Sequence, residues 1–150
     1  MKKVVKVVGL VILVVSANAC FGQRESILGQ WKTIDDVTGK ERSVVEIYEH
    51  GGKFFGKVLS IFEPPPDDPD PVCDECDEDD PRFMQRVIGM QIIRNMEYDE
   101  SDDEYEDGDI LDPENGSVYD CRLWVEDGKL KVRGYILFLY RTQTWYRYDG

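Results

Sequence analysis

Three cysteines carry the most distinctive chemistry in this chain. Cys73 and Cys76 are separated by two residues, and Cys121 follows much later. A pair at this spacing forms a disulfide in an oxidising compartment, or serves redox or zinc chemistry in a reducing one. The acidic residues in 74–78 disfavour a further negative charge on sulfur, which argues against a reactive thiolate. A structural disulfide is therefore the main expectation.

The pairing of these sulfurs stays open at the level of sequence. Cys73 and Cys76 would close a very small loop, whereas a bond from Cys121 to one of them would pin an acidic segment to the rest of the domain. The alternative is a metal site with three thiolates, completed by an Asp, because structural zinc takes four ligands. The fourth ligand has no evident source, since the only histidine is His50.

The carboxylates are concentrated in two runs. Ten acidic residues and no basic ones lie in 63–81, and nine acidic residues and no basic ones lie in 97–109. The formal charge of the whole chain is −13. Outside these two runs and the first six residues, by contrast, Lys and Arg slightly outnumber Asp and Glu. Runs of like charge are typical of solvated segments that repel each other and polyanions. We expect two long acidic loops, the second of them mobile, and no nucleic-acid partner.

Part of the second run is similar to the calcium loop of an EF-hand. Residues 103–114 place five residues in register: Asp103, Asp107, Gly108, Ile110 and Glu114. Tyr105 occupies the position of an oxygen ligand and Pro113 lies inside the loop, so we interpret the match as accidental. The sequence predicts no cofactor, with calcium at the acidic runs or another metal at the cysteines as the alternative.

Catalytic patterns are weak in this chain. The one histidine lies in a His50-Gly51-Gly52 turn, which leaves no natural Ser-His or Cys-His relay. No glycine-rich loop of the phosphate-binding kind is present. An enzyme of unknown reaction is therefore the weaker alternative to a non-catalytic protein.

The first 22 residues have the pattern of a secretory signal. Lys2, Lys3 and Lys6 precede an apolar stretch, 7–15, and residues 17–19 supply the small side chains that a signal peptidase reads. The apolar stretch is too short for a stable membrane span. We expect an exported protein, periplasmic or extracellular, whose single domain comprises residues 23–150. Lipidation of Cys20 is the alternative in which the protein would reach the membrane.

The cysteines and carboxylates described above must be positioned by β-strands. The strand pattern is clearest near the C-terminus. Apolar and polar residues alternate in 117–125, 130–136 and 141–147, which is the period of a half-buried strand. Asp127-Gly128 lies between the first two, and this pair favours a type I′ hairpin turn because both positions need a positive φ.

The earlier part of the chain supplies the remaining strands. Residues 29–34, 43–49, 53–62 and 109–111 are expected as strands, and 87–93 as a strand or a short helix. Five prolines in 64–71 exclude a helix or an inner strand there. About eight strands joined mainly by short turns predict an all-β fold, a single antiparallel up-and-down barrel that closes its own edges.

Several motifs in order resemble a bacterial secreted family catalogued as domain of unknown function 2147. They are Gly29-x-Trp31, Cys73-x-x-Cys76, Tyr119-x-Cys121 and the runs 43–48, 110–116, 130–135 and 141–147. The resemblance implies a lipocalin-like barrel outside the cytoplasm and no assigned activity. This chain departs from the family pattern at Tyr140, where Gly is usual, and in its heavier acidic runs.

The resemblance to lipocalin-type barrels also assigns roles to single residues. It implies that Trp31 closes one barrel end, covered by a basic residue of the last strand, Arg141 or Arg147. An eight-stranded barrel has room for one small ligand, and the expected interior residues are Trp31, Tyr119, Leu123, Val132 and Ile136. We therefore expect a binding module for a small ligand or a cell-envelope partner, with a metal- or cation-binding envelope protein as the alternative.

Overall fold

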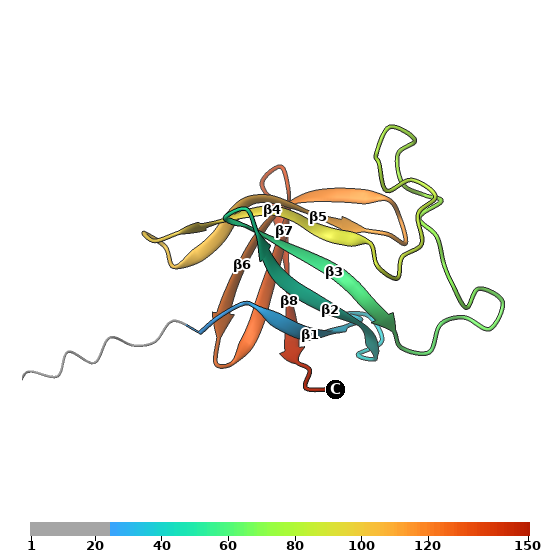
Figure 1. The fold of residues 1–150 in the computed structure, drawn as a ribbon, viewed down its shortest axis with the longest axis horizontal. Coiled ribbons are helices and arrows are strands. Elements are labelled where there is room, and N and C mark those ends of the chain that lie inside the picture. The colour runs from blue at the N-terminus through green and yellow to red at the C-terminus, as the bar shows by residue number, and fades with distance from the viewer. Residues whose placement is uncertain (1–24) are drawn as a thin grey trace, which may run out of the picture.

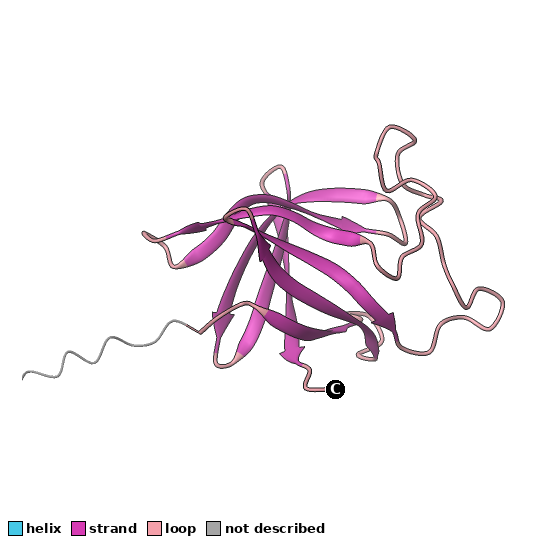
Figure 2. Cartoon of the chain, viewed as in Figure 1, coloured by secondary structure: helices cyan, strands magenta, loops and turns pink. Residues whose placement is uncertain are grey.

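Eight antiparallel strands account for most of residues 25–150, the part of the chain that the computed structural model describes. The predicted leader, 1–22, and Cys20 lie outside these residues. The strands, drawn in Figures 1 and 2, are β1 (Gly29–Ile34), β2 (Glu41–His50), β3 (Lys53–Ile61), β4 (Gln91–Asp99), β5 (Glu104–Asp112), β6 (Ser117–Glu126), β7 (Lys129–Ile136) and β8 (Leu139–Arg147).

The sheet is closed. Each strand pairs with its neighbours in chain order, and β1 pairs with β8 through Trp31 opposite Arg147 and Lys32 opposite Tyr146. Closure leaves no unpaired sheet edge. The predicted all-β up-and-down barrel is thus confirmed. Within residues 25–150 no helix is long and apolar enough to span a membrane.

The core follows from the alternation of the strands. Trp31, Val45, Leu123, Leu130 and Trp145 are each 2% exposed or less, and all belong to one buried cluster. The Asp127-Gly128 turn has φ values of 53° and 71°, so the predicted conformation is confirmed. The predicted strands 29–34, 43–49, 53–62, 117–125, 130–136 and 141–147 are confirmed with small changes at their ends.

The second acidic run is not a mobile loop, and this prediction was wrong. Residues 97–109 form the end of β4, a short turn and most of β5. Their carboxylates meet basic residues on adjacent elements: Glu97 lies 2.6 Å from Lys53 Nζ, Glu106 3.0 Å from Arg122, and Asp109 3.3 Å from Arg94. Opposite charges across a sheet support strand pairing, so the run is compatible with the barrel wall.

Two irregularities conceal these strands in the sequence. Asn95 in β4 and Asp107 in β5 have φ values of 61° and 60°, at points where the register with the neighbouring strand shifts. A bulge inserts a residue and breaks the period of two. The prediction for 87–93 was correspondingly misplaced, because β4 begins at Gln91 and the preceding residues belong to a loop.

The first acidic run is a long loop, as predicted. Residues 62–90 fold back on themselves through one bridge, Val72 with Arg86, and through hydrogen bonds of the Cys73 and Val87 amides. The loop extends along one end of the barrel, at the right of Figure 1. It carries the positions that complete the site described next.

Candidate functional site

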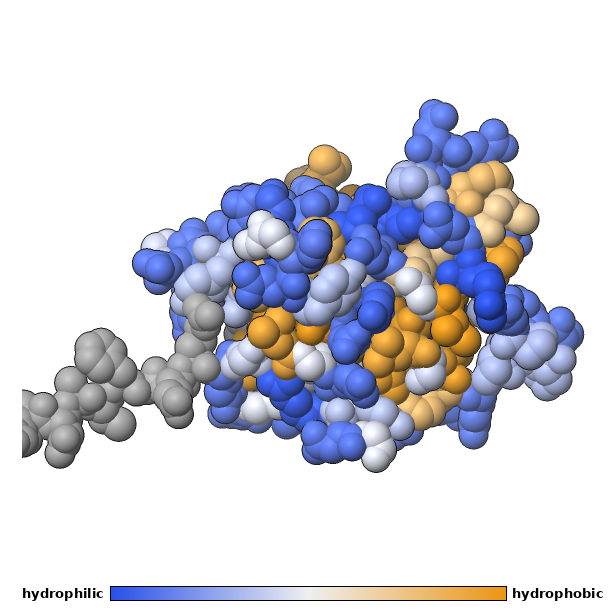
Figure 3. All heavy atoms as spheres, viewed as in Figure 1, coloured by the Kyte–Doolittle hydropathy of each residue, from blue (hydrophilic) through white to orange (hydrophobic). Residues whose placement is uncertain are grey.

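The barrel opens at one end into a cavity of about 720 Å³. The ends of strands at this side contribute to its lining, together with the 62–90 loop and the turn that follows β5. Figure 3 shows apolar side chains gathered beside the end of β3, next to the loop and framed by hydrophilic residues. Cavities of 300–1,000 Å³ are typical of small-molecule sites.

The cavity wall is mainly apolar. Its deep part is formed by buried residues from five strands: Val58, Ile92, Leu111, Val132 and Trp145. Two pairs of polar side chains in the wall bond to each other. The hydroxyls of Thr33 and Ser43 lie 2.8 Å apart, and the indole NH of Trp145 donates to Gln143 Oε1 at 3.0 Å. The wall therefore suits a largely apolar molecule.

The cavity mouth has an excess of negative charge. Its lining has two arginines, and both are paired with carboxylates. Arg42 lies 2.7 Å from Glu114 and 3.3 Å from Asp112, and Arg141 lies 2.6 Å from Asp36. Among residues 25–150, the carboxylates that line the cavity are Asp68, Asp74, Asp112 and Glu114.

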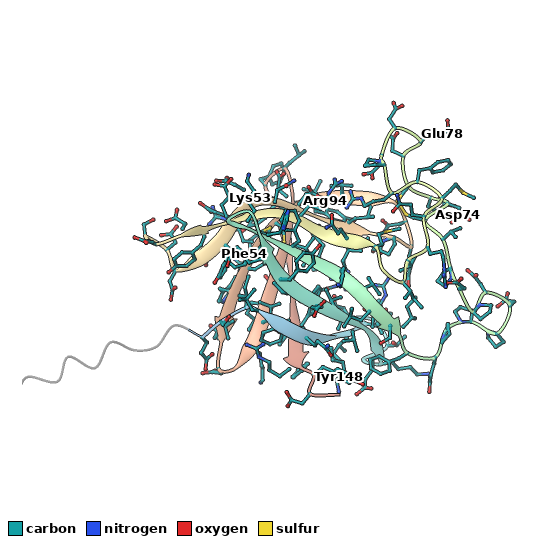
Figure 4. All side chains as sticks on the ribbon, viewed as in Figure 1. Lys53, Phe54, Asp74, Glu78, Arg94 and Tyr148 are labelled. Atoms are coloured by element: carbon teal, nitrogen blue, oxygen red, sulfur yellow. A yellow bond between two sulfur atoms is a disulfide. The ribbon has the colours of Figure 1, made fainter. Side chains whose placement is uncertain are left out.

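The 62–90 loop forms one wall of the cavity and is fixed at two points. The first is a disulfide between Cys73 and Cys76, whose Cys73 sulfur lies 3.5 Å from the Pro113 carbonyl oxygen in the turn after β5. Asp74 and Glu78, on and beside this short disulfide loop, are labelled in Figure 4. The contact joins the loop to the turn after β5.

The second fixed point is Arg82, which is 4% exposed. Its guanidinium donates to both carboxylate oxygens of Asp80, at 2.9 and 2.7 Å, and to the Gln91 carbonyl at 3.3 Å. The Arg82 hydrogen bonds lower the pKa of Asp80 from 3.8 to about 2, although partial burial opposes the shift. A paired and hydrogen-bonded arginine of this kind holds the loop against β4.

The predicted interior residues separate into two groups. Tyr119, Val132 and Ile136 line the cavity, and Ile136 lies at its exposed mouth. Trp31 and Leu123 do not line it, which corrects the prediction for these two residues. Both are fully buried in the packed core, because the barrel interior is filled near its other end. The loop residues of the wall, such as Pro71 and Val72, were not predicted as site residues, and no periodic signal marks them.

The closed end of the barrel is built around Trp31. The guanidinium carbon of Arg147 lies 3.8 Å from the centre of the Trp31 ring, and the indole NH donates to the Ile27 carbonyl at 2.7 Å. Arg147 also donates to the carbonyls of Leu28, at 2.6 Å, and Ser26. Arg141 lies at the cavity mouth instead. Of the two residues that the resemblance left open, Arg147 is the one over the ring.

Within the described part of the chain, Cys121 takes no part in a cysteine cluster. It is a free thiol, 3% exposed, on β6, and burial raises its pKa well above the usual range. The disulfide joins Cys73 and Cys76, in agreement with the main expectation of a structural disulfide, so these two sulfurs are not available as thiolates for the alternative metal site. In residues 25–150 no group of three or more His, Cys, Asp or Glu side chains is arranged to hold a metal ion.

The EF-hand pattern also has a structural explanation. Residues 103–114 consist mainly of β5, not of a calcium loop. A Cβ on Gly108 would lie 2.3 Å from the Arg94 carbonyl oxygen and 2.4 Å from the Met96 sulfur. The glycine that fits the calcium pattern thus allows β4 and β5 to approach at a bulge.

Comparisons with known proteins agree with this architecture. The model of a bacterial family described as "Uncharacterized protein conserved in bacteria (DUF2147)" matches residues 29–147, a range that contains all eight strands. No curated protein matches the chain. A solved structure, "Protein HP1028 from the human pathogen Helicobacter pylori belongs to the lipocalin family", is similar in fold, with a TM-score of 0.69 and 18% identity over 83% of this chain and 84% of that one. The fold is lipocalin-like, and the chain belongs to the bacterial family DUF2147.

Proposed function

We propose that this protein binds one small, largely apolar ligand in the open end of its barrel. The observation that supports the proposal is the cavity of about 720 Å³, with a wall of buried aliphatic side chains and Trp145. A site of this size encloses most of a small ligand, and apolar area that leaves water contributes roughly 25 cal/mol per Å². A cell-envelope protein that contacts the mouth is the second kind of partner. Neither role involves nucleic acid.

The proposed role is non-catalytic. Catalytic acids and bases are recognised by shifted pKa values in a cleft. Among the described residues, the groups with a clearly shifted pKa are Asp35, Asp80, Asp99, Glu106 and Cys121. None of the five lines the cavity. Their shifts have local structural causes, such as the Arg82 hydrogen bonds to Asp80.

The proposed location is the periplasm or the extracellular space. The signal-like pattern of residues 1–22 supports export. The Cys73–Cys76 disulfide supports it independently, because disulfides persist in oxidising compartments. The ligand is accordingly a molecule of the cell envelope or of the surrounding medium.

Two measurements test the ligand. Native mass spectrometry of protein purified from its own host's envelope should show a retained organic molecule. The purified protein should also increase the emission of N-phenyl-1-naphthylamine, a neutral apolar dye. The variant Val132→Phe fills the cavity wall and should weaken dye binding at least tenfold. Its matched control is Val118→Phe on β6, because Val118 is 46% exposed and does not line the cavity. Equal dye binding by both variants would contradict the proposed function.

A further inference from the structure

The turn between β7 and β8 exposes a run of apolar side chains. Leu137 and Phe138 are 89% and 86% exposed, and their neighbours Ile136, Leu139 and Tyr140 are also exposed. The hairpin projects at the top of Figure 1, where Figure 3 shows apolar atoms in an otherwise hydrophilic region. Exposed apolar residues are ordinary when scattered, but a contiguous group of them marks an interaction site.

The turn has a backbone conformation that does not suit its sequence. Leu137 has a φ of 55°, in the left-handed region that favours glycine and asparagine. The turn between β6 and β7 uses Asp127-Gly128 for the same task and exposes polar groups. A glycine at position 137 would relieve the strain and remove an exposed apolar side chain. The turn itself therefore gives no reason for a leucine at position 137, and the exposed side chain is available for an interaction.

The hairpin is layered along its length. Below the apolar tip, Tyr135 and Tyr140 face each other with ring centres 5.9 Å apart. The next pairs along the strands contain Arg141 and then Arg133, whose guanidinium carbon lies 4.5 Å from the Tyr140 ring. At about 3.3 Å per residue, these arginines lie roughly 10–13 Å from the tip.

This order matches the chemistry of a lipid surface. Apolar side chains enter the outer acyl region by about 5–10 Å, and tyrosines lie at the level of the headgroups. Arg133, which stacks on Tyr140, lies at the depth of the phosphates, whereas the charge of Arg141 is already paired with Asp36. We propose that the tip of the β7–β8 hairpin inserts into the surface of a lipid bilayer. Ile136, Leu139 and Tyr140 also line the cavity, so insertion turns the cavity mouth toward the bilayer. This inference does not rest on the proposed ligand.

The test uses protein without residues 1–22, which keeps the whole barrel and has no leader or acyl chain at Cys20. Flotation with phosphatidylcholine vesicles should recover a bound, salt-insensitive fraction. The double variant Leu137→Gly/Phe138→Ser should reduce the vesicle partition coefficient at least tenfold. Its melting temperature should stay equal or rise, because glycine accepts the positive φ. The control Val37→Ser removes a lone valine that is 88% exposed and should change the partition coefficient less than twofold.

A second readout locates the tip directly. The variant Phe138→Trp should give a blue-shifted indole emission with vesicles, quenched by lipids brominated near the headgroup. The proposal is overturned if the protein without residues 1–22 and without substitutions does not float with the vesicles. It is also overturned if Val37→Ser lowers the partition coefficient as much as the double variant does. The third contrary outcome is a Phe138→Trp variant whose emission with vesicles stays that of an indole in water. Sedimentation velocity gives the remaining outcome. A concentration-dependent dimer that the double variant abolishes would assign the hairpin to a second copy of the chain and overturn lipid binding.

Discussion

Gly116 lies so close to the backbone of Glu75 that a Cβ on Gly116 would be 1.8 Å from the Glu75 carbonyl oxygen. The two residues belong to the turn after β5 and to the disulfide loop between Cys73 and Cys76. Their contact packs the disulfide loop against the turn after β5, next to the cavity-lining residues Asp74 and Glu114. The glycine is required there for space and also for its φ of +69°.

Gly116→Ala should therefore displace the 62–90 loop. The matched control is Gly128→Ala, because Gly128 has a φ of +71° and a Cβ there would meet nothing within 4 Å. The control isolates the cost of a left-handed alanine, about 1–2 kcal/mol. The clash should add roughly 1–3 kcal/mol for Gly116→Ala. Urea denaturation measures both variants, and equal free energies of unfolding would show that the contact does not matter.

Arg147→Ala should destabilise the closed end of the barrel. The variant loses the contact with the Trp31 ring and two hydrogen bonds to backbone carbonyls, together worth about 2 kcal/mol at this exposed position. Arg147→Lys should recover less than half of the loss, since an ammonium does not stack or reach both carbonyls.

Arg141 supplies the control for this prediction. Its side chain is exposed and pairs with Asp36, so Arg141→Ala should cost less than about 1 kcal/mol. Thermal unfolding ranks the variants. A larger loss from Arg141→Ala than from Arg147→Ala would reverse the assignment of the residue that closes the barrel.

Asp80 should make the free energy of unfolding depend on pH in the acidic range. Its pKa is lowered from 3.8 to about 2 in the folded protein, so its contribution is present above pH 4 and is lost as the pH falls from about 4 to about 2. Asp80→Asn should lower the free energy of unfolding by about 1–2 kcal/mol at pH 7. The difference from the unmodified protein should shrink as the pH falls below about 4 and should be largely lost at about pH 2. Guanidinium titrations between pH 2 and pH 7 measure it, and a constant difference would contradict the assignment.

The charge of the cavity mouth should select among ligands with the same apolar tail. Four carboxylates and two paired arginines leave the mouth negative. At low salt, a dodecyl chain with a trimethylammonium head should bind about tenfold more tightly than one with a carboxylate head, and salt should reduce the ratio. A dodecyl maltoside should fall between them. Tighter binding of the ligand with the carboxylate head would contradict the inferred role of the charge at the mouth. If none of the three ligands bound, the result would count against the cavity as a ligand site.

The strand order could be predicted because its signals are local. Alternation in residues 117–147, the Asp127-Gly128 turn and the prolines after β3 act through neighbours in sequence, and signals of this kind placed six of the eight strands. The prediction for the second acidic run was wrong because its signals are not local. Its bulges at Asn95 and Asp107 break the local period, and the basic partners of its carboxylates, Lys53 among them, come from other strands.

The amino-acid sequence by itself determined the strand count, the turns and the pair of cysteines in an acidic loop. Only the tertiary structure decided that Cys73 bonds Cys76, that Arg147 covers Trp31, and that Val132 faces a cavity whereas Leu123 packs in the core. These outcomes depend on distances between residues far apart in the chain. Barrel closure and the path of the 62–90 loop set those distances, and no periodicity within one strand records them.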